Sequence, residues 1–570
     1  MPSLPDLRLK LLIPMLFVLL QASRAQFINI DAQSAAQVEY IFLRHLQKFD
    51  CAGGSLGLIR NGEIVYLHGF GFQNAETGIP ATEFTMYRTA SIAKMITAVL
   101  ALQLKENGKL DLFRNVRDYV PEYPQKAQGV INAHHLLSHQ SGIPHNEDYD
   151  TLQLLGYEEK FSEFNAVAAV DVFKNSALRF APGSDYLYTT FGYNLLGAVV
   201  ERAGAQQYLA QLRERILTKG DLPFLQAEYA SRRPYPNETK GYHRLHGNRF
   251  VTTDTIGIKY KVPGGGMIGT VIDLTLFLQQ FLSHGFFTSQ ATEDSMTMIH
   301  AASGSYGYGL WIGERNGKKI LWHSGSQEKT NTIILLEPES KNAVAVMLNT
   351  FQSEAKLLAE ELLDAIPTMQ SPGKKYQHIP HLLDRPTLLS PQPGEKISDA
   401  RATLQWSGVP FGYSYVVQID TTPSFLHAVS DSHYSTEIQS MYLGSGKKYF
   451  WRVKAVNAYL YDGTESDWSE TRSFSVLPTT RVERPVQRGS MRLFPNPNAG
   501  SFEVATTSIG QRIEAIEIYT IIGQKIFEEK NLDHQSYRIN LSSRAPSMLF
   551  VKITASDGSS YYQKISISGR

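Results

Sequence analysis

The chain has 570 residues, 42% of them hydrophobic, so it is globular and too long to fold around a single core. Its 55 Lys and Arg residues balance its 54 Asp and Glu residues, and no basic stripe indicates a nucleic-acid partner. We therefore expect two to four domains and no binding of nucleic acid.

Residues 1–25 are typical of a secretory signal peptide. Arg8 and Lys10 precede an apolar run, and Ser23-Arg24-Ala25 offers small residues at the cleavage positions. No later stretch approaches the roughly 20 apolar residues that a transmembrane helix needs. We expect an exported protein with no transmembrane segment after cleavage. Its one cysteine, Cys51, cannot form an internal disulfide, so packing must supply the stability.

Two apolar runs around Asn61-Gly62, between residues 55 and 71, predict a β-hairpin. Gly53-Gly54-Ser55-Leu56-Gly57 fits the G-x-S-x-G motif of α/β-hydrolases, which requires a helix directly after the serine. Because a strand and a hairpin turn follow instead, we interpret Ser55 as structural.

Ser91 begins a helix that carries a lysine one turn later. Apolar residues recur at three- and four-residue steps from Ile92 until Gly108, which predicts a helix packed on a core. Lys94 lies on the same helical face as Ser91 and can reach its hydroxyl group. A hydroxyl is a weak nucleophile without a base, and a lysine kept neutral by burial can be that base. The alternative is that Ser91 is an ordinary helix cap.

The same Ser-x-x-Lys spacing recurs at Ser326, Ser353, Ser371 and Ser445. Ser353 opens an amphipathic helix and is better interpreted as its N-cap. Ser371 and Ser445 lie among Pro, Gly and Lys residues that are typical of loops. Only Ser91 combines a helix start with a strongly apolar helix body that would desolvate its lysine.

The middle of the chain contains two further signals. His135 and His139 are four residues apart in a predicted short helix, but no acidic residue lies between them as in H-E-x-x-H, so we predict no metal site and no cofactor. Tyr188 falls between a Pro-Gly turn and an apolar helix. The glycine run 264–266 is either a plain loop or a place where the backbone approaches another group closely.

Residues 308–311, 320–326, 332–336 and 343–347 are strand-like, and an amphipathic helix is predicted at 353–366. This pattern is typical of one antiparallel sheet. Because strands also begin the domain, its two ends could form one sheet while the middle supplies a helical part.

A linker rich in Pro, Gly and Lys spans about 367–390, and two all-β segments follow it. In residues 391–477, Tyr415, Val417 and Ile419 alternate, as do Tyr449, Trp451, Val453 and Ala455, with Trp406 and Trp468 as further core candidates. This segment resembles a fibronectin type III module.

A second linker covers 478–491. Residues 492–570, with Leu493-Phe494-Pro495-Asn496-Pro497 at the start and Phe550-Val551-Lys552-Ile553 near the end, resemble the C-terminal sorting domain of type IX secretion cargo. The resemblance implies export by the type IX machinery, with the mature protein outside the cell or on the outer-membrane surface. The alternative is a second adhesive β-sandwich.

Residues 40–366 resemble the class C β-lactamase and D-alanyl-D-alanine carboxypeptidase family of serine hydrolases. Three motifs follow the order of the family: Ser91-Ile92-Ala93-Lys94, Tyr188-Thr189-Thr190 and His323-Ser324-Gly325. Leu136-Leu137-Ser138-His139 and Gly307-Tyr308-Gly309-Leu310 also match in order, and the details are most similar to a mitochondrial, peptidase-type branch of the family. We expect this catalytic domain to span residues 26–366.

The resemblance implies that Ser91 attacks a carbonyl group and that Lys94 and Tyr188 pass its proton to the leaving group. The backbone N–H groups of Ser91 and Ser326 would form the oxyanion hole. Tyr188 could act as a base if Lys94 and a charged His323 lowered its pKa.

The resemblance further implies that Thr190, Ser324 and Gly325 contact the substrate. Tyr235-Pro236-Asn237 fits the Tyr-x-Asn pattern better than the sequence at Tyr188, but it lies in a charged, Pro-rich loop.

Two positions depart from the family pattern. Thr190 stands where Asn is usual, which makes strong β-lactamase activity doubtful. His323 replaces a lysine that holds a carboxylate group, and histidine loses its charge near neutrality. We therefore hypothesise that activity on carboxylate substrates falls as the pH rises through about 6 to 7.

The fold class predicted is α+β: an antiparallel sheet flanked by helices with a helical subdomain, followed by two small all-β sandwich domains. The predicted function is a secreted serine acyl hydrolase that acts on a peptide, a D-amino-acid peptide, an ester or a lactam. The alternative is a surface binding or scaffold protein whose lactamase-like domain is catalytically weak.

Overall fold

The structure is a computed structural model, and the chain divides into two compact units with a boundary near residue 382. The predicted signal peptide, residues 1–25, and the loop residues Tyr235 and Pro236 lie outside the described residues. The structure describes residues 27–145, 164–228, 237–245, 249–252, 257–300, 304–371, 373, 376, 383–399, 401–409, 412, 414–433, 435–440, 442–456, 465–478, 491–494, 501–506, 512–520, 525–541 and 547–567.

The first unit is built on an antiparallel sheet of eight strands. The predicted hairpin is present, and Asn61 and Gly62 both have positive φ angles, of 53° and 82°, as a tight two-residue turn requires. The strand order is β1-β3-β2-β13-β12-β11-β10, with β4 paired to β3. The bounds are β1 (Phe27–Ile28), β2 (Gly53–Arg60), β3 (Glu63–Asn74), β4 (Ile79–Pro80), β10 (Trp311–Arg315), β11 (Lys318–Gln327), β12 (Thr330–Glu337) and β13 (Asn342–Leu348).

The two ends of this unit meet in the sheet, because β13 pairs with β2 and places Val346 opposite Leu56. The prediction that early and late strands form one sheet is therefore confirmed. The predicted strand at 308–311 is wrong, since β10 begins only at Trp311. Gly309 has a φ of 78°, so the chain turns there instead of extending.

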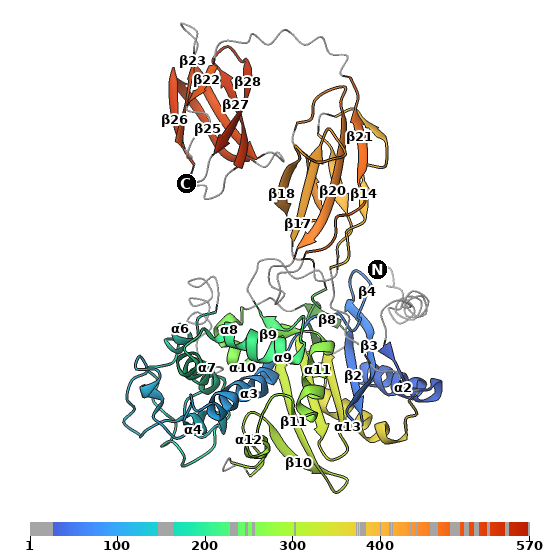
Figure 1. Cartoon of the computed structure of the whole chain (residues 1–570), viewed down its shortest axis with the longest axis vertical. Helices are drawn as coiled ribbons and strands as arrows, with labels where there is room; N and C mark the ends of the chain where they lie inside the picture. The colour runs from blue at the N-terminus through green and yellow to red at the C-terminus, as the bar shows by residue number, and fades with distance from the viewer. Residues whose placement is uncertain are drawn as a thin grey trace, which may run out of the picture. The chain divides into compact units, whose positions relative to one another are not determined.

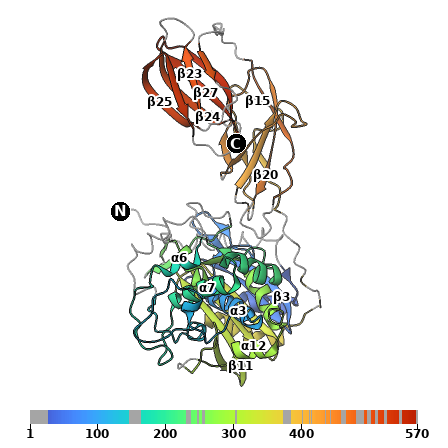
Figure 2. The ribbon, with the colours of Figure 1, turned by 60° about the vertical axis from the view of Figure 1, so that its left-hand side comes forward.

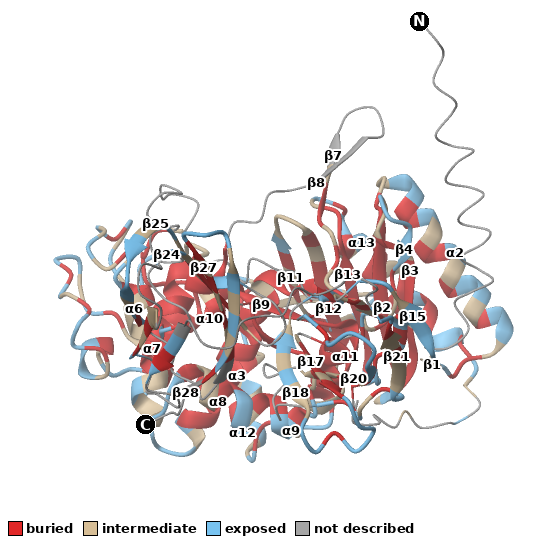
Figure 3. Cartoon of the chain, turned by 90° about the horizontal axis from the view of Figure 1, so that it is seen from above, coloured by how far each residue is buried: buried red, intermediate tan, exposed pale blue. Residues whose placement is uncertain are grey.

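Helices cover both faces of the sheet. On one face, α2 (Ala32–Lys48) and α13 (Ala355–Ala365) share a core with Leu56 and Leu58 of β2. On the other face lies α11 (Val271–Leu282), where a side chain at Gly57 would collide with Thr275. Seen from above, the central strands are almost entirely buried (Figure 3).

The predicted N-cap at Ser353 is wrong. Glu354, which has a φ of 55°, occupies the cap position of α13, and the Ser353 hydroxyl donates to the Thr350 carbonyl oxygen instead.

The middle of the chain supplies the predicted helical part, in which α3 (Ala93–Glu106) and α7 (Thr190–Gly204) pack together (Figures 1 and 2). Every residue of α3 from Ala93 to Leu104 is buried, which agrees with its apolar sequence. The remaining helical elements and short strands of this unit are η1 (Ala90–Ile92), η2 (Val116–Asp118), α4 (Ala133–Leu137), α6 (Ala166–Val170), α8 (Tyr208–Leu212), η4 (Arg213–Leu217), α9 (Thr218–Gly220), η5 (Lys259–Lys261), α10 (Val262–Gly265), α12 (Gln290–Met296), η6 (Ile366–Thr368), β5 (Tyr87–Arg88), β6 (Gln226–Ala227), β7 (Tyr242–Leu245), β8 (Arg249–Thr252) and β9 (Met267–Gly269).

The second unit contains only β-strands among its described elements, as predicted. Its first part forms a three-stranded and a five-stranded sheet around the buried Trp406 and Trp451, while Trp468 is half-buried beneath Arg452. Its identity as a fibronectin type III module stays a prediction. The strands are β14 (Leu388–Ser390), β16 (Thr403–Trp406) and β19 (Glu437–Gln439) in one sheet, and β15 (Glu395–Ile397), β21 (Arg472–Val476), β20 (Lys448–Val456), β17 (Ser414–Asp420) and β18 (Val429–His433) in the other.

The last part of the chain forms a three-stranded and a four-stranded sheet around a small apolar core that includes Phe502, Ile516 and Val551. Within the described part of the chain, no helix combines the length and the apolar character needed to cross a bilayer. The strands are β22 (Met491–Phe494), β23 (Ser501–Thr506) and β26 (Ser536–Asn540), then β25 (Lys525–His534), β24 (Ile513–Thr520), β27 (Ser547–Ala555) and β28 (Ser560–Ile567).

Candidate active site

Ser91 lies in the 3₁₀ turn η1 directly before α3 and is partly exposed, whereas the helix behind it is buried. Strand β11 runs beside this turn. A Cβ at Gly325 would lie only 2.4 Å from the Thr89 carbonyl oxygen, so only glycine allows the strand to approach so closely. The Thr332 hydroxyl of β12 donates to the same carbonyl oxygen at 3.1 Å. The sheet therefore fixes the turn that carries Ser91.

Lys94 is fully buried, and its amine nitrogen has three polar neighbours. Nζ lies 3.1 Å from Ser91 Oγ, 3.2 Å from Thr190 Oγ1 and 2.6 Å from the Gly264 carbonyl oxygen. Burial, and then the nearby charge of Lys261, place the Lys94 pKa well below its ordinary value. A neutral amine has two N–H groups and one lone pair. The two N–H groups can donate to the Gly264 carbonyl oxygen and the Thr190 hydroxyl, which leaves the lone pair free to accept the Ser91 proton.

The glycine run is a place of close backbone approach, one of the two readings that the sequence left open. A Cβ at Gly264 would lie 2.8 Å from Thr190 Cγ2 and 2.9 Å from the Thr190 carbonyl oxygen. Glycine therefore lets α10 pack against α7 with its carbonyl group directed at Lys94.

Tyr188 lies just before α7 and shares a hydrogen bond with Ser91. The Lys94 amine nitrogen is 4.7 Å from the centre of the Tyr188 ring. Burial raises the Tyr188 pKa, and the hydrogen bond to Ser91 opposes this only in part. The phenol is therefore protonated at neutral pH. The expectation that Lys94 and a charged His323 would lower its pKa is wrong, because burial raises that pKa and His323 is itself uncharged.

His323 is buried, and both of its ring nitrogens are occupied. Nδ1 lies 2.8 Å from the Ser324 carbonyl oxygen, which can only accept, so Nδ1 carries the proton. Nε2 then accepts from the Tyr306 hydroxyl at 3.1 Å. Burial first, and then Lys94, lower the His323 pKa to about 3, against the effect of the bond to Ser324. His323 is therefore neutral near pH 7, so the charged His323 on which the hypothesised fall in activity between pH 6 and 7 rests is wrong.

The structure brings the predicted catalytic residues together, with the Tyr188 and His323 rings 6.2 Å apart. Thr190 faces Lys94, as the 3.2 Å contact shows. Ser324 is half-buried, and Ser326 is exposed, its hydroxyl accepting from Asn331 at 3.4 Å.

Sequence reasoning missed Tyr306, the partner of His323. It directly precedes the Gly307-Tyr308-Gly309-Leu310 motif, but nothing in that motif indicates a contact with β11.

Outside this group, Ser55 agrees with its predicted reading. Ser55 is buried on β2, and its hydroxyl donates to the Thr82 carbonyl oxygen at 2.7 Å, so it is structural as expected. His139 packs its ring against Tyr188 at 4.3 Å between ring centres, whereas Nε2 of His135 lies close to Gly183. Across the described ranges, no group of three or more His, Cys, Asp or Glu side chains is placed to hold a metal ion.

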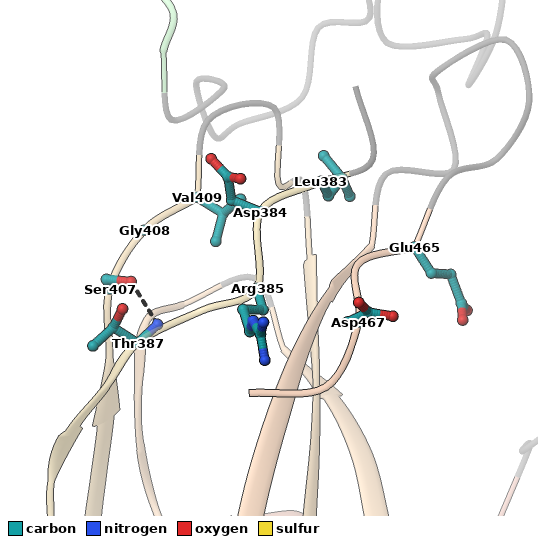
Figure 4. A pocket seen from close by; sticks show the side chains of 9 residues that line it. All are labelled: Leu383, Asp384, Arg385, Thr387, Ser407, Gly408, Val409, Glu465 and Asp467. Atoms are coloured by element: carbon teal, nitrogen blue, oxygen red, sulfur yellow. Dashed lines mark hydrogen bonds between the residues drawn. The ribbon is translucent and has the colours of Figure 1, made fainter. Parts of the chain in front are cut away.

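The second unit has a cavity of about 530 Å³ at one end of its first pair of sheets (Figure 4). In this cavity the Ser407 hydroxyl accepts from the Thr387 backbone N–H at 2.9 Å. No base is hydrogen-bonded to that hydroxyl in the described residues, so the cavity has no arrangement comparable to that of Ser91. Its lining residues are Leu383, Asp384, Arg385, Thr387, Ser407, Gly408, Val409, Glu465 and Asp467.

Comparison with known proteins gives two family matches. Residues 41–366 match the family described as Beta-lactamase, and residues 492–568 match the Secretion system C-terminal sorting domain. The mitochondrial serine beta-lactamase-like protein LACTB of Homo sapiens is 30% identical over 285 residues, which cover 39% of this chain and 52% of that protein. The chain thus spans about half the length of the LACTB relatives that it matches.

Protein flp of Staphylococcus aureus strain N315 is 24% identical over 372 residues, or 63% of this chain and 70% of that protein. Among solved structures, the D-amino acid amidase of Ochrobactrum anthropi SV3 aligns with a TM-score of 0.52 at 21% identity, covering 59% of this chain and 99% of the amidase chain. At this identity, the likeness shows a shared fold.

Proposed function

Because the chain belongs to the Beta-lactamase family of serine hydrolases, we propose that it is a secreted serine acyl hydrolase that forms an acyl-enzyme on Ser91. The substrate in this proposal carries a peptide, D-amino-acid peptide or ester bond. The observation that carries the proposal is the 3.1 Å contact between Ser91 Oγ and the fully buried Lys94 amine. A neutral amine at that distance can remove the hydroxyl proton during attack.

In the first step, Ser91 Oγ attacks the carbonyl carbon and its proton moves to Lys94 Nζ. The carbonyl oxygen becomes an oxyanion, which the backbone N–H groups of Ser91 and Ser326 would stabilise. The approach of β11 to the Ser91 turn, which Gly325 permits, supports this pairing of two N–H donors.

In the second step, the tetrahedral intermediate collapses and the leaving group departs. Tyr188 is a protonated phenol that is hydrogen-bonded to Ser91, so it suits the role of acid: it gives its proton to the leaving group and recovers one from Lys94. A water molecule then attacks the acyl-enzyme, and the same residues run the transfer in reverse to release the acid.

The charges at the site favour neutral acyl substrates. His323 stands where the family resemblance expects a lysine, and it is neutral with both ring nitrogens occupied. It therefore cannot offer a cation to a substrate carboxylate. Thr190 provides no side-chain amide, and its hydroxyl already contacts Lys94. Both features favour esters and simple amides over lactams that carry a carboxylate.

Labelling with a fluorophosphonate probe tests the proposal. We expect the intact protein to be labelled on Ser91 and Ser91→Ala to be unlabelled. Ser326→Ala is the matched control: it also lies in a Ser-x-x-Lys sequence, and its substitution keeps the backbone N–H, so labelling should persist. A folded protein that the probe does not label would contradict the proposal and favour the scaffold alternative. A panel of p-nitrophenyl esters, D-aminoacyl amides and penicillins then identifies the bond that is cleaved.

The match of residues 492–568 to the sorting domain supports export through the type IX secretion system to the cell surface or beyond. We propose that this machinery is the partner of the tail. In a bacterium with that system, deletion of residues 492–570 should retain the enzyme inside the cell. Unchanged export of the truncated protein would contradict this assignment.

A further inference from the structure

His139 contacts the chain on both sides of Tyr188. Its backbone carbonyl oxygen accepts the Leu187 N–H at 2.9 Å, and its ring nitrogen Nδ1 accepts the Thr189 N–H at 3.1 Å. Its ring lies 4.3 Å from the Tyr188 ring between centres. One residue thus fixes the backbone before and after the phenol as well as the phenol ring.

The backbone of His139 is itself in a costly conformation. Its φ is 59°, in the left-handed region that non-glycine residues rarely adopt, and its side chain is fully buried. Such a conformation persists only where surrounding contacts determine it. The bonds to Leu187 and Thr189 are contacts of this kind, and they tie the conformation of residue 139 to Tyr188.

The bond from Thr189 also determines the tautomer of His139. A backbone N–H can only donate, so Nδ1 must present its lone pair and the ring proton lies on Nε2. Nε2 is buried and has no hydrogen-bond partner among the described residues. A second proton on Nδ1 would face the Thr189 N–H and break the bond, so the arrangement requires a neutral ring.

We propose that His139 is a positioning residue for Tyr188, which keeps the phenol hydroxyl on Ser91. The inference rests on the proposed function, since it concerns how Tyr188 is held for acyl transfer. Thr189, whose N–H donates to His139 Nδ1, is the N-cap of α7, and the next residue, Thr190, contacts Lys94. His139 therefore also orders the backbone that leads to the contact between Thr190 and Lys94. Small misplacements of a reacting group cost large factors in rate, about 100-fold for 1 Å.

The experiment measures kcat and KM for p-nitrophenyl butyrate. His139→Phe keeps an aromatic ring against Tyr188 but removes the acceptor. His139→Asn keeps an acceptor at the δ position and tolerates a positive φ. We expect His139→Phe to lower kcat by about 10- to 100-fold with little change in KM, and His139→Asn to restore most of the loss. The control is His135→Phe, a histidine one helical turn earlier whose ring contacts His134 and not Tyr188. Its kcat should remain near that of the original protein.

The Tyr188→Phe background separates positioning from general packing. If His139 acts through Tyr188, His139→Phe should lower kcat little further once the phenol hydroxyl is absent. If His139→Phe lowered kcat by the same factor in the original protein and in Tyr188→Phe, or lowered it in neither, the inference would be overturned. Loss without rescue by His139→Asn would overturn it too. Should His139→Phe fail to fold, His139→Gln takes its place, because its amide oxygen lies one bond too far along to meet the Thr189 N–H. If the fluorophosphonate probe still labelled Ser91→Ala, the proposed function itself would be contradicted.

Discussion

The Lys94 amine donates a hydrogen bond of 2.6 Å to the Gly264 carbonyl oxygen. This bond holds Nζ in place, while Oγ of the partly exposed Ser91 lies 3.1 Å from the same nitrogen. The lysine is thus both fully desolvated and directed, and these are the two conditions under which an amine serves as a base near neutral pH.

Replacing Lys94 by methionine should separate activity from stability. Lys94→Met removes the base but fills nearly the same buried volume, so labelling of Ser91 should slow by about 100-fold or more while the thermal midpoint stays equal or rises. Rates of fluorophosphonate labelling and thermal unfolding curves check this. Lys105→Met, at an exposed position near the end of the same helix, is the control and should label at the original rate. Unimpaired labelling of Lys94→Met would show that another group is the base.

Because His323 is neutral, we expect no effect of its titration on the pH profile of activity. Its pKa of about 3 means that the ring does not change charge between pH 5 and 8. We therefore expect the pH profiles of kcat/KM for the original protein and for His323→Gln to be parallel in that range. If kcat/KM of the original protein changed between pH 6 and 7 while that of His323→Gln did not, the assignment of a neutral His323 would be contradicted.

The same depressed pKa has a consequence for stability. Because the unfolded histidine, with a pKa near 6.5, binds its proton before the folded one does, His323 lowers the free energy of unfolding as the pH falls from about 6.5 toward 3. His323→Gln should reduce this loss, and urea unfolding at pH 4 and pH 7 measures it.

We predict that replacing the carboxyl group of Glu83 stabilises the protein. This side chain is 5% exposed, its Oε2 has no hydrogen-bond partner in the described residues, and burial raises its pKa to about 8. The folded state therefore keeps the proton that the unfolded chain loses, so stability falls as the pH rises from about 4.5 to 8. At pH 7 the loss is on the order of 3 kcal/mol, and Glu83→Gln should recover a large part of it.

Urea unfolding at pH 5 and pH 8 measures this effect. The gain from Glu83→Gln should be larger at pH 8 than at pH 5. Glu214→Gln, at an exposed position, serves as the control and should be neutral at both values. An equal effect of Glu83→Gln at the two pH values would contradict the prediction.

The pair formed by Arg88 and Glu228 predicts strong coupling near the nucleophile. Two parallel bonds of 2.7 Å and 2.6 Å join the side chains, which are 2% and 7% exposed. Arg88→Met alone should destabilise the protein by about 3 to 5 kcal/mol, because it leaves a buried carboxylate without this partner. The double variant Arg88→Met/Glu228→Leu should recover most of that loss.

Urea unfolding of the two single variants and the double variant gives the coupling energy. Breaking the exposed pair of Arg114 and Asp118 by Asp118→Ala is the control and should change little. Additive losses for Arg88 and Glu228 would show that the pair is not coupled.

Local signals in the sequence predicted the elements that bear the chemistry. Asn61-Gly62 indicated a hairpin because few other residues accept its positive φ angles. The apolar stretch after Ser91 indicated a buried helix, and burial in turn predicted a neutral Lys94. In each case the property depends on residues that are neighbours in the chain.

The errors concern properties that depend on distant partners. The charge of His323 is set by burial and by Lys94, more than two hundred residues away in the sequence, and its Nε2 is occupied by Tyr306 from a separate loop. Neither influence has a local signature. The error at Ser353 is of a different kind, because its cause is local: the hydroxyl donates to the Thr350 carbonyl oxygen three residues earlier, and Glu354 takes the cap position.

The pairing of β2 with β13 also bears on when the protein becomes chemically active. The two strands come from opposite ends of the enzyme unit, so the sheet that supports the Ser91 turn is incomplete until Leu348 has been synthesised. A nascent or prematurely terminated chain therefore contains the Ser91 sequence without a formed acyl-transfer site.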